Sequence, residues 1–152
     1  MNKQELEDIK ALCETIREAL EIKRDEHFLF YSFPKGCCRD TSILIAQYLI
    51  RNCDYQESDI RLCFKYLENS SPSHAWLVVK GVMIDVTADQ FGAQYPKVIV
   101  LARQSEYFFH KEDRNNLFVL KEYLTCLDLD FLIFYSKLEE YILKKHKPSK
   151  SF

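Results

Sequence analysis

The chain has 152 residues and a formal net charge of −2, with 47% hydrophobic and 14% aromatic residues, which is the composition of a globular protein and excludes a disordered one. The length predicts a single domain, residues 1–152. Charges of both signs are mixed along the chain, so we expect no nucleic-acid partner, because a nucleic-acid binder would show a basic face.

The hydrophobic spacing predicts helices at the two ends and in the middle of the chain, with strands between them. Apolar side chains recur every three or four residues over 3–24, which is typical of an amphipathic helix. A second helix, over 37–52, is apolar around most of its girth and is expected to be buried. Four strands are expected at 60–67, 74–80, 82–87 and 97–102. A last helical stripe is formed by Leu127, Phe131, Phe134, Leu138, Tyr141 and Ile142.

This order predicts an α+β fold, in which the central helix packs on a small antiparallel sheet and is flanked by the N- and C-terminal helices. Six cysteines lie at positions 13, 37, 38, 53, 63 and 126, and their spacing matches no zinc pattern. The polar start at residues 2–5 is not a signal peptide, and no apolar run approaches the ~18 residues of a membrane span. We expect a cytoplasmic protein with free thiols, no membrane contact and no metal or organic cofactor. Export by a route that reads no cleavable signal is compatible with the same features.

The two central strands are expected to bring a histidine close to an aspartate. If Lys80 and Gly81 form a two-residue turn, His74, Trp76 and Asp85 share one face of the hairpin, because side chains alternate along a strand. Diagonal neighbours on such a face are roughly 7–8 Å apart between backbones, within reach of polar side chains. A three-residue turn would break this relation. Asp89 is a second candidate for the carboxylate.

A pair of cysteines is expected at the start of the central helix. Pro34 and Gly36 end the preceding segment, so the helix begins at or beside Cys37 and Cys38. Backbone N–H groups at a helix N-terminus stabilise an anion, which favours the thiolate, and they can also hold the oxyanion that forms at a carbonyl under attack. The two cysteines differ by ~100° around the helix, so only one can face His74, and the spacing does not choose between them.

Three motifs stand out in this part of the chain: Gly36-x-Cys38-x-Asp40-x-Ser42, His74-Ala75-Trp76 and Ile84-Asp85-Val86-Thr87. Together they resemble the core of the transglutaminase-like branch of the papain-like cysteine superfamily. The resemblance covers about residues 34–91, and the corresponding core is expected at about 34–103. It implies that Cys38 is the nucleophile, His74 the general base and acid, and Asp85 the carboxylate that orients the imidazole.

Two departures from the family pattern bear on the reaction. Many members have a tryptophan upstream of the cysteine that helps to hold the oxyanion, whereas this chain has Tyr31 and Phe33 there. The acidic calcium-site segments of animal transglutaminases have no counterpart, and nothing suggests a second site for an amine. Hydrolysis by a protease or glutamine deamidase is therefore favoured over crosslinking. Gln90, Tyr31 and Trp76 are the candidate substrate contacts.

Two classes of function follow from these residues. The first is a thiol hydrolase or acyltransferase that acts on an amide of a protein or peptide through a thioester. The second is an inactive superfamily member whose cleft holds a protein partner, as in an adaptor, an inhibitor or an immunity protein. The small size and the missing tryptophan favour the second class, whereas the presence of thiol, imidazole and carboxylate together favours the first. The reactivity of the Cys38 thiol discriminates between them.

Overall fold

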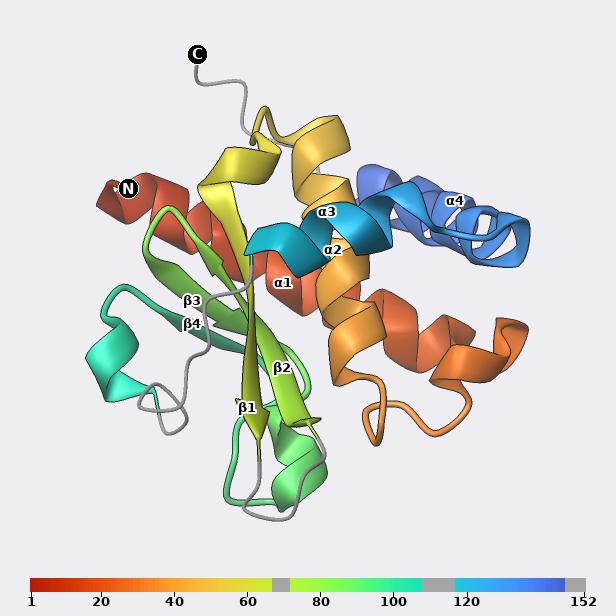
Figure 1. The fold of residues 1–152 in the computed structure, drawn as a ribbon, viewed down its shortest axis with the longest axis horizontal. Coiled ribbons are helices and arrows are strands. Elements are labelled where there is room, and N and C mark those ends of the chain that lie inside the picture. Colours follow the sequence, from red (N-terminus) through yellow and green to blue (C-terminus); the bar gives the residue numbers. More distant parts are fainter. Residues whose placement is uncertain (67–71, 108–116, 147–152) are drawn as a thin grey trace.

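The chain folds as an α+β protein around a small antiparallel sheet (Figure 1). A computed structural model of the protein describes residues 1–66, 72–107 and 117–146. Within these ranges the sheet has four strands in the order β1-β2-β3-β4, which are β1 (Ile60–Tyr66), β2 (Pro72–Val79), β3 (Val82–Asp85) and β4 (Ile99–Leu101). The same ranges contain four α-helices, which are α1 (Lys3–Lys23), α2 (Cys38–Asn52), α3 (Leu117–Thr125) and α4 (Leu129–Lys145).

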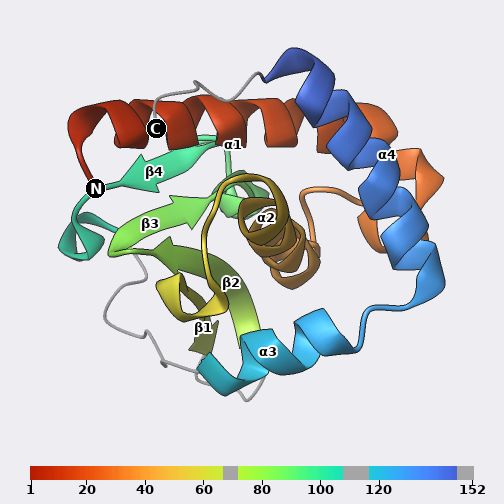
Figure 2. The same cartoon turned by 90° about the horizontal axis from the view of Figure 1, so that it is seen from above.

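Helix α2 occupies the centre of the molecule. Figure 2 shows it end-on, with the sheet on one side and α4 on the other, while α1 runs across one end of both. It packs on β2, and α1 packs on α4 and β4. The expected buried helix is thus confirmed, because eight of its residues are buried: Thr41, Ser42, Ile43, Leu44, Ile45, Ala46, Tyr48 and Leu49.

The β2–β3 hairpin closes with the expected two-residue turn. Lys80 has φ 47° and Gly81 has φ 84°. Positive φ at both central residues is the geometry that matches the twist of a tight hairpin. Val79 therefore pairs with Val82, and the next pairs keep the same register. The alternation of side chains predicted from the sequence holds along both strands.

The ends of several elements differ from the expected ones. Strand β3 ends at Asp85 and not at 87, because the Thr87 N–H donates to the Asp85 side chain, and this local bond replaces a ladder bond. Strand β4 is shorter at both ends than the expected 97–102. Position 67 of the first expected strand lies outside the described residues. Helix α3 was not predicted, since nine mostly apolar residues give no amphipathic period to detect.

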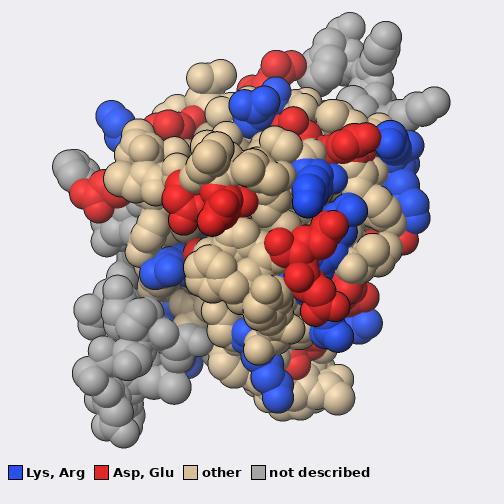
Figure 3. Space-filling view, turned by 90° about the vertical axis from the view of Figure 1, so that its right-hand side faces the viewer, with Lys and Arg blue, Asp and Glu red and all other residues tan. Residues whose placement is uncertain are grey.

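The surface carries charges of both signs. Figure 3 shows acidic and basic side chains intermixed on the side that lies to the right in Figure 1. Among the described residues, none of the helices combines the length and the apolar character needed to cross a membrane.

Arg17 of α1 fixes the segment that follows β3. Its guanidinium binds both carboxylate oxygens of Asp89, at 2.7 and 2.9 Å, and donates to the backbone oxygen of Val86 at 2.8 Å. It also pairs with Glu21 at 2.6 Å and lies 4.8 Å above the centre of the Phe33 ring. Because Arg17 is only 5% exposed, these bonds compensate the burial of its charge. A single side chain thus ties helix α1 to the loop beyond Asp85.

Replacing Arg17 with methionine is expected to lower the free energy of unfolding by about 3 kcal/mol, because it leaves the Asp89 carboxylate part-buried without its partner. Glu21→Gln is the matched control, since Glu21 contacts the same guanidinium but is 40% exposed, and it should cost less than about 1 kcal/mol. Urea unfolding measures both variants. Equal losses would show that the Arg17–Asp89 pair does not fix this loop.

Candidate active site

Asp85, at the end of β3, forms hydrogen bonds through both carboxylate oxygens. The His74 ring approaches Oδ2 with its Nε2 at 2.6 Å, and the Tyr107 hydroxyl donates to the same oxygen at 2.5 Å. The Thr87 backbone N–H and hydroxyl donate to Oδ1 at 2.8 and 3.1 Å. Asp85 is 3% exposed, so it needs these four partners to hold a charge in the interior. The network fixes the carboxylate in one orientation.

Tyr107 serves this network as a donor only. Burial and the neighbouring Asp85 charge raise the pKa of the Tyr107 hydroxyl far above its usual range, so it keeps its proton. It follows Asp85 by 22 residues and lies just after a short turn of 3₁₀-helix, Gln104–Glu106. Sequence reasoning missed this residue, because the surrounding segment has no period that would place it.

Side chains of neighbouring residues fix the position of the His74 ring. Trp76 stacks on it with ring centres 5.9 Å apart, and Phe91 meets it edge-on at 4.9 Å. Its Nε2 faces Asp85, which leaves Nδ1 directed to the rest of the site, 3.3 Å from the side-chain nitrogen of Gln90. Both the position of the ring and the roles of its two nitrogens are therefore set by neighbouring side chains.

The electrostatics of the site favour the charged imidazole. Burial disfavours a charge on His74, but hydrogen bonds with Asp85 and Cys38 and the charges of these two groups outweigh burial and raise the pKa of His74 to about 9. The ring is therefore an imidazolium at neutral pH when the acid and the thiolate are in place. Such a ring can protonate a leaving group, and the neutral ring can accept a proton from the thiol.

The two neighbouring cysteines differ sharply. Cys38 is the first residue of α2, is partly exposed and lies near enough to the His74 ring to raise its pKa. Cys37 is 1% exposed, and its thiol donates to the backbone oxygens of Leu29 and Lys35 at 3.1 and 3.2 Å. Burial, with the charges of Asp40 and Cys38, raises the pKa of Cys37 to about 11. The structure thus separates two candidates that spacing alone could not.

The start of α2 is well placed to stabilise negative charge. The first N–H groups of a helix have no partner inside the helix. The Ser42 hydroxyl donates to the backbone oxygen of Cys38 at 2.8 Å, which holds the first turn in place. Cys38 is the first residue of this helix, and its thiol interacts with the His74 ring. This combination suits a thiolate and the oxyanion of an acyl-transfer intermediate.

The three expected substrate contacts have different surroundings. Gln90 lies in the site, between His74 and the backbone N–H of Gly36. Trp76 is 0% exposed and packs between His74 and Tyr107, so it supports the imidazole and has no surface to offer a substrate. Tyr31 is 58% exposed, at the surface ahead of the cysteine pair. Sequence reasoning did not single out Phe91, which is 40% exposed and lies against the His74 ring.

The alternative carboxylate, Asp89, is paired with Arg17 and not with the imidazole. Cys63 lies opposite Trp76 across the β1–β2 pair and packs in one cluster with Trp76 and Tyr107. Burial raises the pKa of Cys13 to about 12 and that of Cys53 to about 11. Within the described ranges, no group of three or more His, Cys, Asp or Glu side chains is arranged to hold a metal ion.

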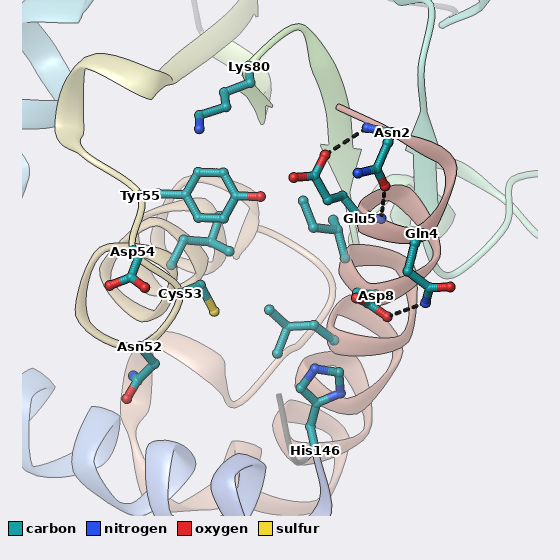
Figure 4. Close-up of a pocket in the computed structure, with 13 residues that line it drawn as sticks. Asn2, Gln4, Glu5, Asp8, Asn52, Cys53, Asp54, Tyr55, Lys80 and His146 are labelled. Atoms are coloured by element: carbon teal, nitrogen blue, oxygen red, sulfur yellow. Dashed lines mark hydrogen bonds between the residues drawn. The ribbon is translucent and has the colours of Figure 1, made fainter. Parts of the chain in front are cut away.

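A cavity of about 290 Å³ lies elsewhere, between the N-terminal turns of α1 and the C-terminal end of α2 (Figure 4). Its lining includes Tyr55 and Lys80, and Figure 4 shows the Lys80 amine extending over the cavity toward Tyr55. Neither the Cys38 thiol nor the His74 ring is part of this lining. The cavity is therefore separate from the cluster around the thiol.

No family model matches the sequence, and no curated protein and no solved structure is similar enough to be matched to it.

Proposed function

We propose that the protein is a cysteine-nucleophile enzyme of the transglutaminase-like, papain-like type, which attacks an amide of a protein or peptide and passes through a thioester. The observation that carries this proposal is the chain of contacts from Asp85 to the His74 ring and on to Cys38. A fully bonded buried carboxylate, an imidazole held by it and a partly exposed thiol at a helix start have the roles that thiol catalysis requires.

Each group has a defined step in this mechanism. His74 Nδ1 accepts the proton of Cys38, and the sulfur forms a bond to the carbonyl carbon while the π pair moves onto the oxygen. The protonated ring then gives its proton to the leaving amine as the carbon–nitrogen bond breaks. Water resolves the thioester by the reverse sequence of proton transfers. Asp85 stabilises the imidazolium throughout and keeps the proton on Nε2.

Hydrolysis is favoured over transfer to an amine. Phe91 and Gln90 lie against the His74 ring, one apolar and one amide side chain, and an amine substrate would gain no carboxylate partner from either. We therefore propose a protease or a glutamine deamidase. The apolar Phe91 ring beside His74 favours substrates with an apolar group next to the amide that is attacked.

Competitive alkylation by iodoacetamide tests the proposal. Cys38 is expected to react fastest, and its rate should change little between pH 8 and pH 6, because His74, whose pKa is raised to about 9, stays protonated over this range and its charge attracts a thiolate. Cys126 is the internal reference, since it is exposed. The thiolate fraction of an ordinary thiol falls about 70-fold between pH 8 and pH 6. Peptide mass spectrometry after short exposure measures all six cysteines in one sample.

The competing function is a binding module whose cleft holds a protein without chemistry. It predicts that Cys38 reacts no faster than Cys126 and loses reactivity to the same extent at pH 6. That result would remove the basis for an enzyme. Selective labelling of Cys38 at pH 6 would instead favour the enzyme over the binding module.

A further inference from the structure

The Gln90 side chain connects the two walls of the site beside the thiol. It belongs to a short 3₁₀-helix, Ala88–Phe91, that follows β3. Its Oε1 accepts from the backbone N–H of Gly36 at 3.3 Å, and its Nε2 lies 3.3 Å from His74 Nδ1. Gly36 comes directly before the cysteine pair. The carboxamide therefore extends from the segment that carries the nucleophile to the ring that activates it.

The bond to Gly36 decides which end of the carboxamide faces the imidazole. A backbone N–H can only donate, so the atom next to Gly36 is the oxygen and the atom next to His74 is the NH₂ group. Because Nε2 of the ring faces Asp85, Nδ1 is the nitrogen that exchanges a proton with Cys38. Gln90 thus donates to the same lone pair that receives the thiol proton.

This arrangement makes the Gln90 donor available at a particular step. Once Nδ1 carries the proton from Cys38, it has no lone pair left to accept the Gln90 N–H. The carboxamide stays anchored by Gly36, so its N–H keeps its place beside the ring but has lost its acceptor. In the same step the attacked carbonyl gains a negative charge on its oxygen, close to the new carbon–sulfur bond.

We propose that the Gln90 Nε2–H is the second donor of the oxyanion hole, together with the backbone N–H groups at the start of α2; this assignment rests on the proposed function. As the sulfur–carbon bond forms and the π pair moves to the oxygen, the Gln90 N–H, which the protonated ring no longer accepts, donates to that oxygen. It gives up no proton. The loop after Asp85 thereby supplies the donor that an upstream tryptophan supplies in many proteins of the resembled family.

Of the two aromatic residues upstream of the cysteine pair, Phe33 cannot fill this role. Phe33 is 3% exposed, has no polar hydrogen and lies under the guanidinium of Arg17. Arg17 in turn holds Asp89, the residue before Gln90. The interactions that bury Phe33 therefore also fix the loop that carries the proposed donor.

Two reagents separate the role of Gln90 from a general loss of reactivity. Acetyl transfer from p-nitrophenyl acetate passes through a tetrahedral oxyanion, whereas alkylation by iodoacetamide displaces iodide and forms none. Gln90→Ala should slow acetylation of Cys38 about 10²- to 10³-fold. It should change the alkylation rate less than about threefold. Gln90→Glu should lose as much acetylation, because a carboxylate cannot donate and repels an oxyanion.

Gln94→Ala is the matched control, since Gln94 is a nearby exposed glutamine, and it should change neither rate. Release of p-nitrophenol and the acetyl mass on the Cys38 peptide are the readouts. A parallel loss of acetylation and alkylation in Gln90→Ala would assign Gln90 to positioning of His74, and unchanged acetylation would leave it without a catalytic role; either result overturns the assignment. Acetylation of wild-type protein that is no faster than that of Cys38→Ala would instead overturn the proposed function, and the assignment with it.

Discussion

Replacing Cys38 with alanine is expected to abolish acyl transfer, while the same change at Cys37 leaves it in place. Cys38 interacts with the His74 ring and is partly exposed, so its loss removes the proposed nucleophile. The Cys37 thiol is bonded to two backbone oxygens and has a raised pKa, so it is held as a neutral thiol. Two adjacent cysteines should thus give opposite results in one assay of p-nitrophenyl acetate cleavage.

The stability of the two variants should differ in the opposite sense. Cys38→Ala is expected to change the free energy of unfolding by less than about 1 kcal/mol, because the side chain is partly exposed. Cys37→Ala should cost about 1–3 kcal/mol, because it leaves a small cavity and removes the thiol proton that two part-buried backbone oxygens share. Urea unfolding separates loss of function from loss of fold. Full acyl transfer in Cys38→Ala would remove the thiol from the mechanism.

A comparison of wild-type protein with Cys38→Ala offers a route to the substrate of the proposed enzyme. Wild-type protein incubated with a lysate and then quenched in acid should retain an acyl group on the Cys38 peptide, because a thioester survives acid better than base. Cys38→Ala supplies the blank. The mass and fragmentation of the adduct would identify the acyl group: a peptide joined through its C-terminal carbonyl would indicate a protease, and one joined through a glutamine side chain a deamidase.

Replacing Asp85 with asparagine is expected to lower acyl transfer by about 10³- to 10⁴-fold. The asparagine amide donates where the carboxylate accepted, so Nε2 of His74 must accept and the ring proton moves to Nδ1. A neutral ring with its proton on Nδ1 cannot take the proton of Cys38. Tyr107→Phe is the milder comparison, because it removes one donor to Asp85 and keeps the charge, and it should cost far less.

The ring titration gives an independent readout of the same change. In the wild-type protein the pKa of His74 is about 9, above its ordinary value of 6.5, because contacts with Asp85 and Cys38 outweigh burial. Asp85→Asn removes the first of these contacts while burial remains, so the pKa should fall. An NMR titration of the His74 ring measures this directly. An unchanged titration would contradict the contact between the two side chains.

The raised pKa of His74 also has a consequence for stability. The folded state holds the ring proton more tightly than the unfolded chain does, so this contribution to stability is complete below pH 6.5 and is lost as pH rises through about 9. In the proposed mechanism the protonated His74 ring donates to the leaving amine, and this proton is lost as pH rises through the same value of about 9. Activity and stability of the wild-type protein should therefore decline together on the alkaline side, and Asp85→Asn should lack this shared decline.

Much of the secondary structure follows from local patterns. Helices α1, α2 and α4 have apolar stripes or an apolar girth that can be recognised along the chain. The first three strands lie where they are expected, although some of their ends differ by one or two residues. The length of the turn at Lys80 and Gly81 fixes which side chains share a face. For this reason the contact between His74 and Asp85, 11 residues apart, could be predicted from the sequence before any distance was known.

The remaining parts of the site depend on segments that are distant in sequence. Tyr107 is 22 residues from Asp85, Gln90 is 54 from Gly36, and Asp89 is 72 from Arg17. No local period relates such residues, because their meeting depends on how α1, α2 and the sheet pack. The choice between Cys37 and Cys38 is of the same kind, since it depends on the rotation of α2 about its own axis.

The sequence by itself determined an α+β plan, a hairpin that places an imidazole and a carboxylate on one face, and a pair of thiols at the start of a helix. Only the tertiary structure decided which thiol meets the ring, which donors keep the carboxylate charged and where the Gln90 carboxamide lies. The reason is physical: turn length and side-chain alternation act over a few residues, whereas burial and hydrogen bonding of charged groups depend on every element that packs around them.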